Sequence, residues 1–122
     1  MFSPARLIRS FQYAWNGIRS TFVSEQNFRI QICIGILVLL LAVGLSIPLS
    51  HIAFLVLVVT FVLVLELLNT AWERMLDLMH PGLSPAVRLI KDLLAAFVFI
   101  ASLGAVITGL LLLGPPLINL FF

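Results

Sequence analysis

The chain has 122 residues, of which 62% are hydrophobic and 10% are charged, with seven Lys and Arg against five Asp and Glu. Soluble domains carry about 25% charged residues, so this composition excludes an ordinary soluble protein and indicates an integral membrane protein. One membrane domain over residues 1–122 is expected, because each spanning helix takes about 20 apolar residues. The few basic residues are better explained by lipid headgroups than by nucleic acid, so no nucleic-acid partner is expected.

The first predicted element is an amphipathic helix over residues 5–22. At about 100° per residue, its apolar side chains fall within about 120° and its polar side chains gather on the opposite side. The apolar face includes Leu7, Phe11, Trp15 and Ile18. A helix of this kind lies in the membrane interface, where it can act as a plain surface anchor or support a site.

The next stretch, residues 30–65, carries no Lys, Arg, Asp or Glu. As one helix it would be about 54 Å long, nearly twice the roughly 30 Å hydrocarbon core, so it must fold back. Gly44 and Pro48 place the hinge at residues 44–50, with Ser46 or Ser50 available as a cap. The predicted spans are residues 28–46 and 49–79.

A turn at residues 80–85 separates the second span from a third, predicted over residues 86–113. Gly114, Pro115 and Pro116 are expected to end that helix, because proline cannot donate the helical hydrogen bond. The predicted fold class is therefore an all-α membrane protein with an interfacial helix and three transmembrane helices. Ala101, Ala105 and Gly109 recur every four residues in the third span and allow close helix packing, within one chain or in a homo-oligomer.

The basic residues indicate the orientation of these spans. All of them lie at the start of the chain, up to the first turns of the first span, or near the loop between the second and third spans. Because Lys and Arg are retained on the cytoplasmic side, the N-terminus and the loop at residues 80–91 are expected there. The C-terminus is then outside.

A polar stripe interrupts the second span at "ELLNTAWERMLDL", residues 66–78. Glu66, Asn69, Glu73 and Asp77 fall within an arc of about 80° on a helix and climb about 16 Å along it. Burying an ionisable side chain at membrane depth costs at least about 2.5 kcal/mol, so such a residue indicates a functional site. Glu66 lies deepest in the membrane.

The remaining acids also fall on the cytoplasmic side, with Glu25 before the first span and Asp92 beside Lys91 at the third. Clustered carboxylates suit Mg²⁺, which is often shared between protein carboxylates and substrate phosphates. The set therefore fits metal-assisted phosphoryl transfer with a carboxylate as base. A phosphate-binding GxxxxGK[ST] loop is absent from the sequence, so Mg²⁺, Lys91 and arginines would hold a nucleotide.

Other interpretations of the same residues remain open at this stage. Asp77 and Arg74 could form an ion pair at a solvated helix end, and Asn69 could make a hydrogen bond between helices. The stripe of carboxylates could also line a cation path in a membrane module without enzymatic activity.

The order of these motifs resembles the prokaryotic diacylglycerol kinase and undecaprenol kinase family. "ELLNTAWERMLDL" is followed by "KD" at residues 91–92 and preceded by "SEQNFR" at residues 24–29. The resemblance covers residues 5 to about 110. It implies a small bacterial inner-membrane enzyme that works as a homotrimer with sites between subunits and transfers phosphate from MgATP to a membrane lipid.

The resemblance also implies roles for individual residues. Glu66 corresponds to the catalytic base that takes the proton of a lipid hydroxyl, and Glu25 and Glu73 correspond to metal ligands. Asn69 and Asp77 complete a polar shell. The residues at nucleotide-contacting positions are Arg6, Tyr13, Glu25, Glu73, Lys91 and Asp92.

The segments "SEQNFR" and "LLNTA" resemble the undecaprenol kinase branch of the family more than the diacylglycerol kinase branch. The resemblance therefore favours undecaprenol as the acceptor, with diacylglycerol as the alternative. The chain departs from the family at Gly82-Leu83-Ser84, where an acidic-aromatic-His triplet that touches the nucleotide is usual. Leu94 and Phe97 are also larger than the residues that the family favours after "KD".

Overall fold

The computed structural model describes residues 3–122 and is built from four helices, with no strand among the described residues. They are α1 (Pro4–Ser24), α2 (Gln26–Gly44), α3 (Leu49–Met79) and α4 (Pro85–Phe121). Three of them, α2, α3 and α4, are long and apolar enough to cross a membrane. The predicted all-α fold with an N-terminal helix and three membrane-length helices is confirmed.

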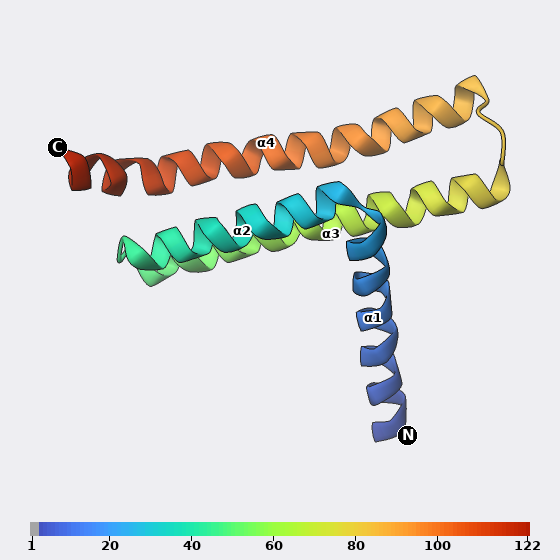
Figure 1. The fold of residues 1–122 in the computed structure, drawn as a ribbon, viewed down its shortest axis with the longest axis horizontal. Coiled ribbons are helices and arrows are strands. Elements are labelled where there is room, and N and C mark those ends of the chain that lie inside the picture. Colours follow the sequence, from blue (N-terminus) through green and yellow to red (C-terminus); the bar gives the residue numbers. More distant parts are fainter. Residues whose placement is uncertain (1–2) are drawn as a thin grey trace.

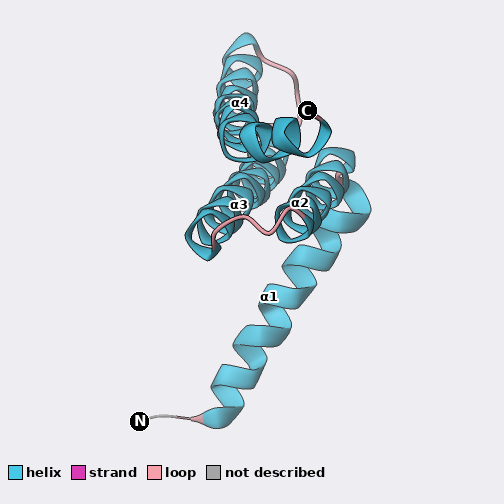
Figure 2. Cartoon of the chain, turned by 90° about the vertical axis from the view of Figure 1, so that its left-hand side faces the viewer, coloured by secondary structure: helices cyan, strands magenta, loops and turns pink. Residues whose placement is uncertain are grey.

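The three long helices run side by side, with α3 packed against both α2 and α4 (Figure 1). Helix α1 leaves this bundle at a steep angle and contacts α2 and α3 near its C-terminal end (Figures 1 and 2). Its apolar side chains at Leu7, Phe11 and Trp15 are exposed in the single chain. That orientation suits a helix that lies along a membrane surface while the bundle crosses it.

A tight turn joins α2 to α3 and sets the geometry of the hairpin. Ser46 adopts a positive φ of 53°, Ser46 N–H donates to the carbonyl of Val43, and Ile47 N–H donates to the carbonyl of Ala42. This pair of hydrogen bonds is the Schellman motif, in which the left-handed position is usually glycine. The buried side chains of Ala42 and Ile47 belong to one core cluster, the apolar contact that accompanies the motif.

The expectation that a serine side chain caps this hinge is wrong. Helix α3 begins after Pro48, and no side chain caps its first turn. The carbonyl of Pro48 instead accepts from the N–H groups of His51 and Ile52. Ser46 serves the turn through its backbone, and Ser50 lies in the first turn of α3.

The expectation that Gly114, Pro115 and Pro116 end the third long helix is also wrong, because α4 continues through both prolines to Phe121. A proline inside a helix removes one hydrogen bond and bends the helix rather than always ending it. The last turns of α4 bend across the end of α2 (Figure 2). Leu113 and Leu117 there pack into the core cluster with Ala42, Ile47 and Leu55, which stabilises the bent segment.

The buried core of one chain is small. Among the described residues it consists of eight apolar side chains, and most large apolar side chains of α2, α3 and α4 are exposed. Exposed apolar surface on this scale is suited to lipid or to other protein chains rather than to water. The site therefore lies in a bundle whose outer surface is itself apolar.

Candidate active site

The centre of the site is Glu66, in the middle of α3. Its side chain is only 3% exposed, and its Oε2 accepts a hydrogen bond of 3.2 Å from Nε2 of Gln31 on α2. A carboxylate can only accept hydrogen bonds, so the amide nitrogen is the group of Gln31 that suits it. The packing of α2 on α3 thus brings together two polar side chains that are 35 residues apart in the chain.

Two polar residues extend this centre along α3. The Thr70 hydroxyl donates 3.0 Å to the backbone carbonyl of Glu66, one turn earlier. The Oδ1 atom of Asn69 and the Oε1 atom of Gln31 are buried without a hydrogen-bond partner in the described part of the chain. Leaving a buried acceptor unpaired costs about 1–3 kcal/mol, so both atoms are suited to a partner from outside the chain.

Two further carboxylates lie near Glu66. Glu25, the residue between α1 and α2, and Glu73, two turns along α3, lie close enough to Glu66 for their charges to act on it. Ser24 donates a 2.9 Å hydrogen bond to Oε1 of Glu25. The described residues contain no group of three or more His, Cys, Asp and Glu side chains arranged to hold a metal ion by themselves.

This donor set nevertheless fits Mg²⁺, because that ion is usually held by one or two carboxylates together with substrate phosphates and water. Glu25 and Glu73 supply hard oxygen donors, and neither forms an ion pair with a Lys or Arg among residues 3–122. A cation bound between them would offset the repulsion of neighbouring negative charges.

An ion pair joins the C-terminal end of α3 to the N-terminal end of α4, the two ends that are predicted to face the cytoplasm. Lys91 Nζ lies 2.5 Å from Oδ1 of Asp77, across the loop that connects the two helices. The alternative in which Asp77 pairs with Arg74 is therefore wrong, because Asp77 pairs with Lys91 instead. Asp92, next in sequence, is exposed.

Arg74 forms a contact that the sequence did not reveal. Its guanidinium donates to the hydroxyls of Ser20 at 2.9 Å and Ser24 at 2.8 Å, which ties α3 to α1. Arg29 of α2 donates to the backbone carbonyls of Phe22 and Val23 at 2.8 and 2.9 Å. Basic side chains often satisfy the unpaired carbonyls of a helix C-terminus in this way. The two arginines fix the angle between α1 and the bundle.

Arg6 and Tyr13 lie apart from this cluster within one chain. Both are exposed on α1, Tyr13 by 70%, and α1 extends away from the bundle (Figure 2). At 1.5 Å per residue, Arg6 is about 29 Å and Tyr13 about 18 Å along the chain axis from Glu25. Within the single chain, Glu25 and Glu73 lie near enough for their charges to act on Glu66, whereas Arg6 and Tyr13 lie apart from these carboxylates.

The last residue of the loop at residues 80–84 has a structural role. The Oγ atom of Ser84 accepts a 3.2 Å hydrogen bond from Val87 N–H and caps α4, while Pro85 occupies the first turn. Both features favour the start of a helix. Gly82 and Leu83 are exposed in the connection between α3 and α4.

Sequence reasoning found the carboxylates but missed Gln31. An amide near the start of an apolar helix has no distinctive pattern, and only the pairing of α2 with α3 shows its role. The signal available was that Gln31 is the one amide side chain within the uncharged residues 30–65. In an apolar segment, such a side chain tends to meet a polar partner on a neighbouring helix.

Three membrane-length helices with a carboxylate buried between them, and two more carboxylates beside it, define a helical membrane protein with a charged site inside its bundle. Comparison with known proteins narrows this class. Residues 12–113 match the family described as prokaryotic diacylglycerol kinase. The chain therefore belongs to the prokaryotic diacylglycerol kinase family, whose members are lipid phosphotransferases.

Curated relatives with two different names are similar to the chain. It is 39% identical to the diacylglycerol kinase of Synechocystis sp. over 93% of its own length and 66% of the relative's. It is 31% identical to the diacylglycerol kinase of Escherichia coli K12 over 88% of each chain. It is 33% identical to the undecaprenol kinase of Bacillus subtilis over 92% of its own length and 91% of the relative's. The similar proteins are thus named for two different lipids, diacylglycerol and undecaprenol.

Proposed function

We propose that the protein transfers the γ-phosphate of MgATP to the hydroxyl of a membrane lipid, with Glu66 as the catalytic base. The Glu66 carboxylate takes the hydroxyl proton, the lipid oxygen forms a bond to the γ-phosphorus, and the bond from that phosphorus to the β-phosphate oxygen breaks to release ADP. The observation that carries this proposal is the position of Glu66, which is 3% exposed between membrane-length helices. A base at that depth is placed to meet a hydroxyl from the bilayer.

The charged residues nearer the helix ends suit the nucleotide. Glu25 and Glu73 would hold Mg²⁺, which neutralises charge on the transferring phosphates when it is bound. Lys91 would contact phosphate, and its present partner Asp77 keeps its ammonium group in place. Arg6, Tyr13 and Asp92 are proposed nucleotide contacts, and Asn69 with its unpaired Oδ1 completes the polar shell.

Undecaprenol is the proposed acceptor, and diacylglycerol is the alternative. The sequence "SEQNFR" supports undecaprenol, and the similarity to relatives named for each lipid supports a test of both side by side. The basic residues support a bacterial inner-membrane location with the N-terminus in the cytoplasm and the C-terminus outside. ATP then reaches the site from the cytoplasmic side.

The direct test is transfer of labelled phosphate from ATP by the purified protein in detergent to undecaprenol and diacylglycerol, offered separately and together. We expect labelled undecaprenyl phosphate, and we expect Glu66→Gln to lose activity by roughly 100-fold or more, the scale of losing a general base. Glu66→Gln that retains the activity of the unchanged protein would remove Glu66 as base. Labelled phosphatidate instead would assign diacylglycerol, and no product from either lipid would favour a membrane module without activity.

The same assay tests the proposed metal ligands. Glu73→Gln and Glu25→Gln should each raise the Mg²⁺ concentration needed for half-maximal activity, because each removes one charged oxygen donor. Asp92→Asn is the matched control, since Asp92 is exposed and is not a proposed metal ligand. A Mg²⁺ titration identical in Glu73→Gln and in the unchanged protein would contradict the assignment of Glu73.

A further inference from the structure

A single hydrogen bond holds the Glu66 carboxylate among the described residues. Its Oε2 atom accepts from Nε2 of Gln31 at 3.2 Å. Thr70 also contacts Glu66, but its hydroxyl donates to the backbone carbonyl and not to the carboxylate. A glutamate side chain rotates about three single bonds, so it keeps one orientation only where a contact offsets the lost freedom. Gln31 is the residue that provides this contact.

The hydrogen bond distinguishes the two oxygens of the Glu66 carboxylate. Oε2 is engaged by Gln31, whereas Oε1 of Glu66 accepts no hydrogen bond from residues 3–122. Both carboxylate oxygens are acceptors, so Oε1 is the oxygen left free to take a proton. The Oε1 atom of Gln31 has no partner within the described part of the chain, and the orientation of the amide is therefore set by Glu66. A reversed amide would bring two oxygen acceptors together, which repel each other.

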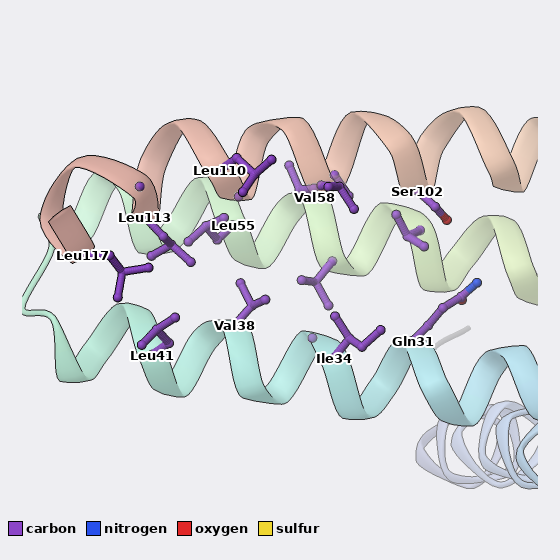
Figure 3. A pocket seen from close by; sticks show the side chains of 17 residues that line it. Gln31, Ile34, Val38, Leu41, Leu55, Val58, Ser102, Leu110, Leu113 and Leu117 are labelled. Carbon is purple, nitrogen blue, oxygen red and sulfur yellow. The ribbon is translucent and has the colours of Figure 1, made fainter.

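The surroundings of this pair strengthen the hydrogen bond. Figure 3 shows Gln31 extending from α2 into the space between the helices, beside an apolar groove whose other end lies at Leu41 and Leu117. Apart from Gln31 and Ser102, the residues that line this groove are apolar. A hydrogen bond is electrostatically stronger in such surroundings than in water. One amide is therefore enough to hold the carboxylate.

Close packing of α2 on α3 places Gln31 within reach of Glu66. Gly35 follows Gln31 by four residues on the same face of α2, and a Cβ added there would lie 2.6 Å from the Val59 side chain of α3. Val59 precedes Glu66 by seven residues, which places both on one face of α3. The two helices form a hairpin and run in opposite directions, so Gln31 comes beside Glu66 where Gly35 comes beside Val59. Groups carried by packed helices are held more precisely than groups on loops.

We infer that Gln31 is a positioning residue for the proposed phosphate transfer, and that its amide holds the Glu66 carboxylate so that Oε1 meets the acceptor hydroxyl. The inference rests on the proposed function. Gln31 exchanges no proton and contacts no phosphate, and it acts only through Glu66. Misplacing a reacting group by about 1 Å can cost roughly 100-fold in rate. Loss of the hydrogen bond should therefore slow the chemical step without weakening the binding of either substrate.

Gln31→Met tests this inference, because methionine has a similar length and shape but no N–H donor. In the labelled-ATP assay, kcat should fall roughly 10- to 100-fold, while KM for MgATP and KM for the lipid stay within about twofold. A residue that only supports the fold would instead lower the unfolding midpoint in detergent and leave the kcat of the folded protein unchanged. Gln31→Asn is the second variant, since its shorter amide falls short of Glu66, and kcat should fall in it as well.

Gln26→Met is the matched control. It makes the same chemical change on the same helix, and Gln26 is exposed and makes no side-chain hydrogen bond among residues 3–122. Its kcat should equal that of the unchanged protein. Gln31→His is the conservative variant, because the Nε2–H of a neutral imidazole can donate and reaches about as far as the amide. It should restore most of the kcat that Gln31→Met loses.

Three results would overturn the inference. They are a kcat for Gln31→Met equal to that of Gln26→Met, a loss that Gln31→His does not restore, and a loss that appears in KM alone. If Gln31→Met does not fold, the same criteria apply to Gln31→Asn. Failure of the proposed function looks different, since the unchanged protein then transfers no phosphate to either lipid and the inference falls with it. Full kcat in both Gln31→Met and Gln31→Asn would keep the activity and reject only the role of Gln31.

Discussion

At the residue scale, the site depends on where single polar side chains are placed in an apolar bundle. The importance of Glu66 was predictable, because burying a lone glutamate in a membrane-length segment has a large desolvation cost. Such a residue therefore indicates a functional site. Its partner was not predictable, because Gln31 reaches Glu66 only through the packing of α2 on α3. Likewise, the sequence placed Arg74 at a helix end but could not show that Ser20 and Ser24 receive its hydrogen bonds.

Ser46 gives a prediction at this scale. Its φ of 53° is a left-handed conformation that costs an L-residue about 1–2 kcal/mol and that glycine adopts readily. Ser46→Gly should therefore raise the free energy of unfolding by about 0.5–1 kcal/mol, measured by thermal or denaturant unfolding in detergent.

Ser50→Gly is the matched control for that measurement. Ser50 lies inside the first turn of α3, where glycine lowers stability by about 0.5–1 kcal/mol relative to alanine. The two variants should shift the unfolding midpoint in opposite directions. A lower midpoint for Ser46→Gly would show that the turn does not carry the strain described here.

At the element scale, hydropathy and turn residues were enough to predict four helices, but not the end of the last one. Proline was expected to end α4 because it lacks a donor and crowds the preceding turn. The segment after Pro116 remains helical since Leu113 and Leu117 gain apolar contacts with Ala42 and Leu55. Such tertiary contacts do not appear in local sequence.

The junction of α1 with the bundle gives a prediction at the element scale. Arg74→Ala removes both hydrogen bonds to Ser20 and Ser24, so the last turns of α1 should open more often. Amide hydrogen exchange there should become roughly tenfold faster, which corresponds to about 1.4 kcal/mol. Arg74→Lys should give most of the same effect, because an ammonium group lacks the planar fork that reaches two acceptors.

The control for this experiment is Arg88→Ala. This substitution removes the same charge on the same side of the bundle. The side chain of Arg88 makes no hydrogen bond among residues 3–122. Exchange in α1 should be the same as in the unchanged protein. Faster exchange in both variants would attribute the effect to net charge rather than to the contacts of Arg74.

At the scale of the whole molecule, one chain leaves two features incomplete. Its membrane-length helices expose most of their large apolar side chains, and Arg6 and Tyr13 lie far from Glu25 along α1. Assembly of several copies would cover part of that surface and could bring α1 of one copy to the carboxylates of another. This arrangement agrees with the homotrimer expected from the resemblance.

A mixing experiment tests that assembly. The protein purified in detergent should have the mass of three chains. Glu66→Gln and Arg6→Ala chains, each inactive alone, should regain activity when they are refolded or expressed together, because one site in a mixed trimer then has neither substitution. Mixing Glu66→Gln with Glu73→Gln should restore less, since those two residues share one helix. A monomeric mass, or no gain in any mixture, would contradict shared sites.

The contacts of the arginines have a further consequence for how the molecule responds to its surroundings. Arg29 and Arg74 direct their hydrogen bonds to serine hydroxyls and backbone carbonyls, which carry no net charge. Bonds of this kind are less sensitive to ionic strength than exposed pairs of opposite charges. The Ser24 hydroxyl that accepts from Arg74 also donates to Oε1 of Glu25, so a single hydroxyl links this junction to the carboxylates. Because the bonds of the two arginines end on neutral groups, the junction of α1 with the bundle is expected to persist as the salt concentration rises.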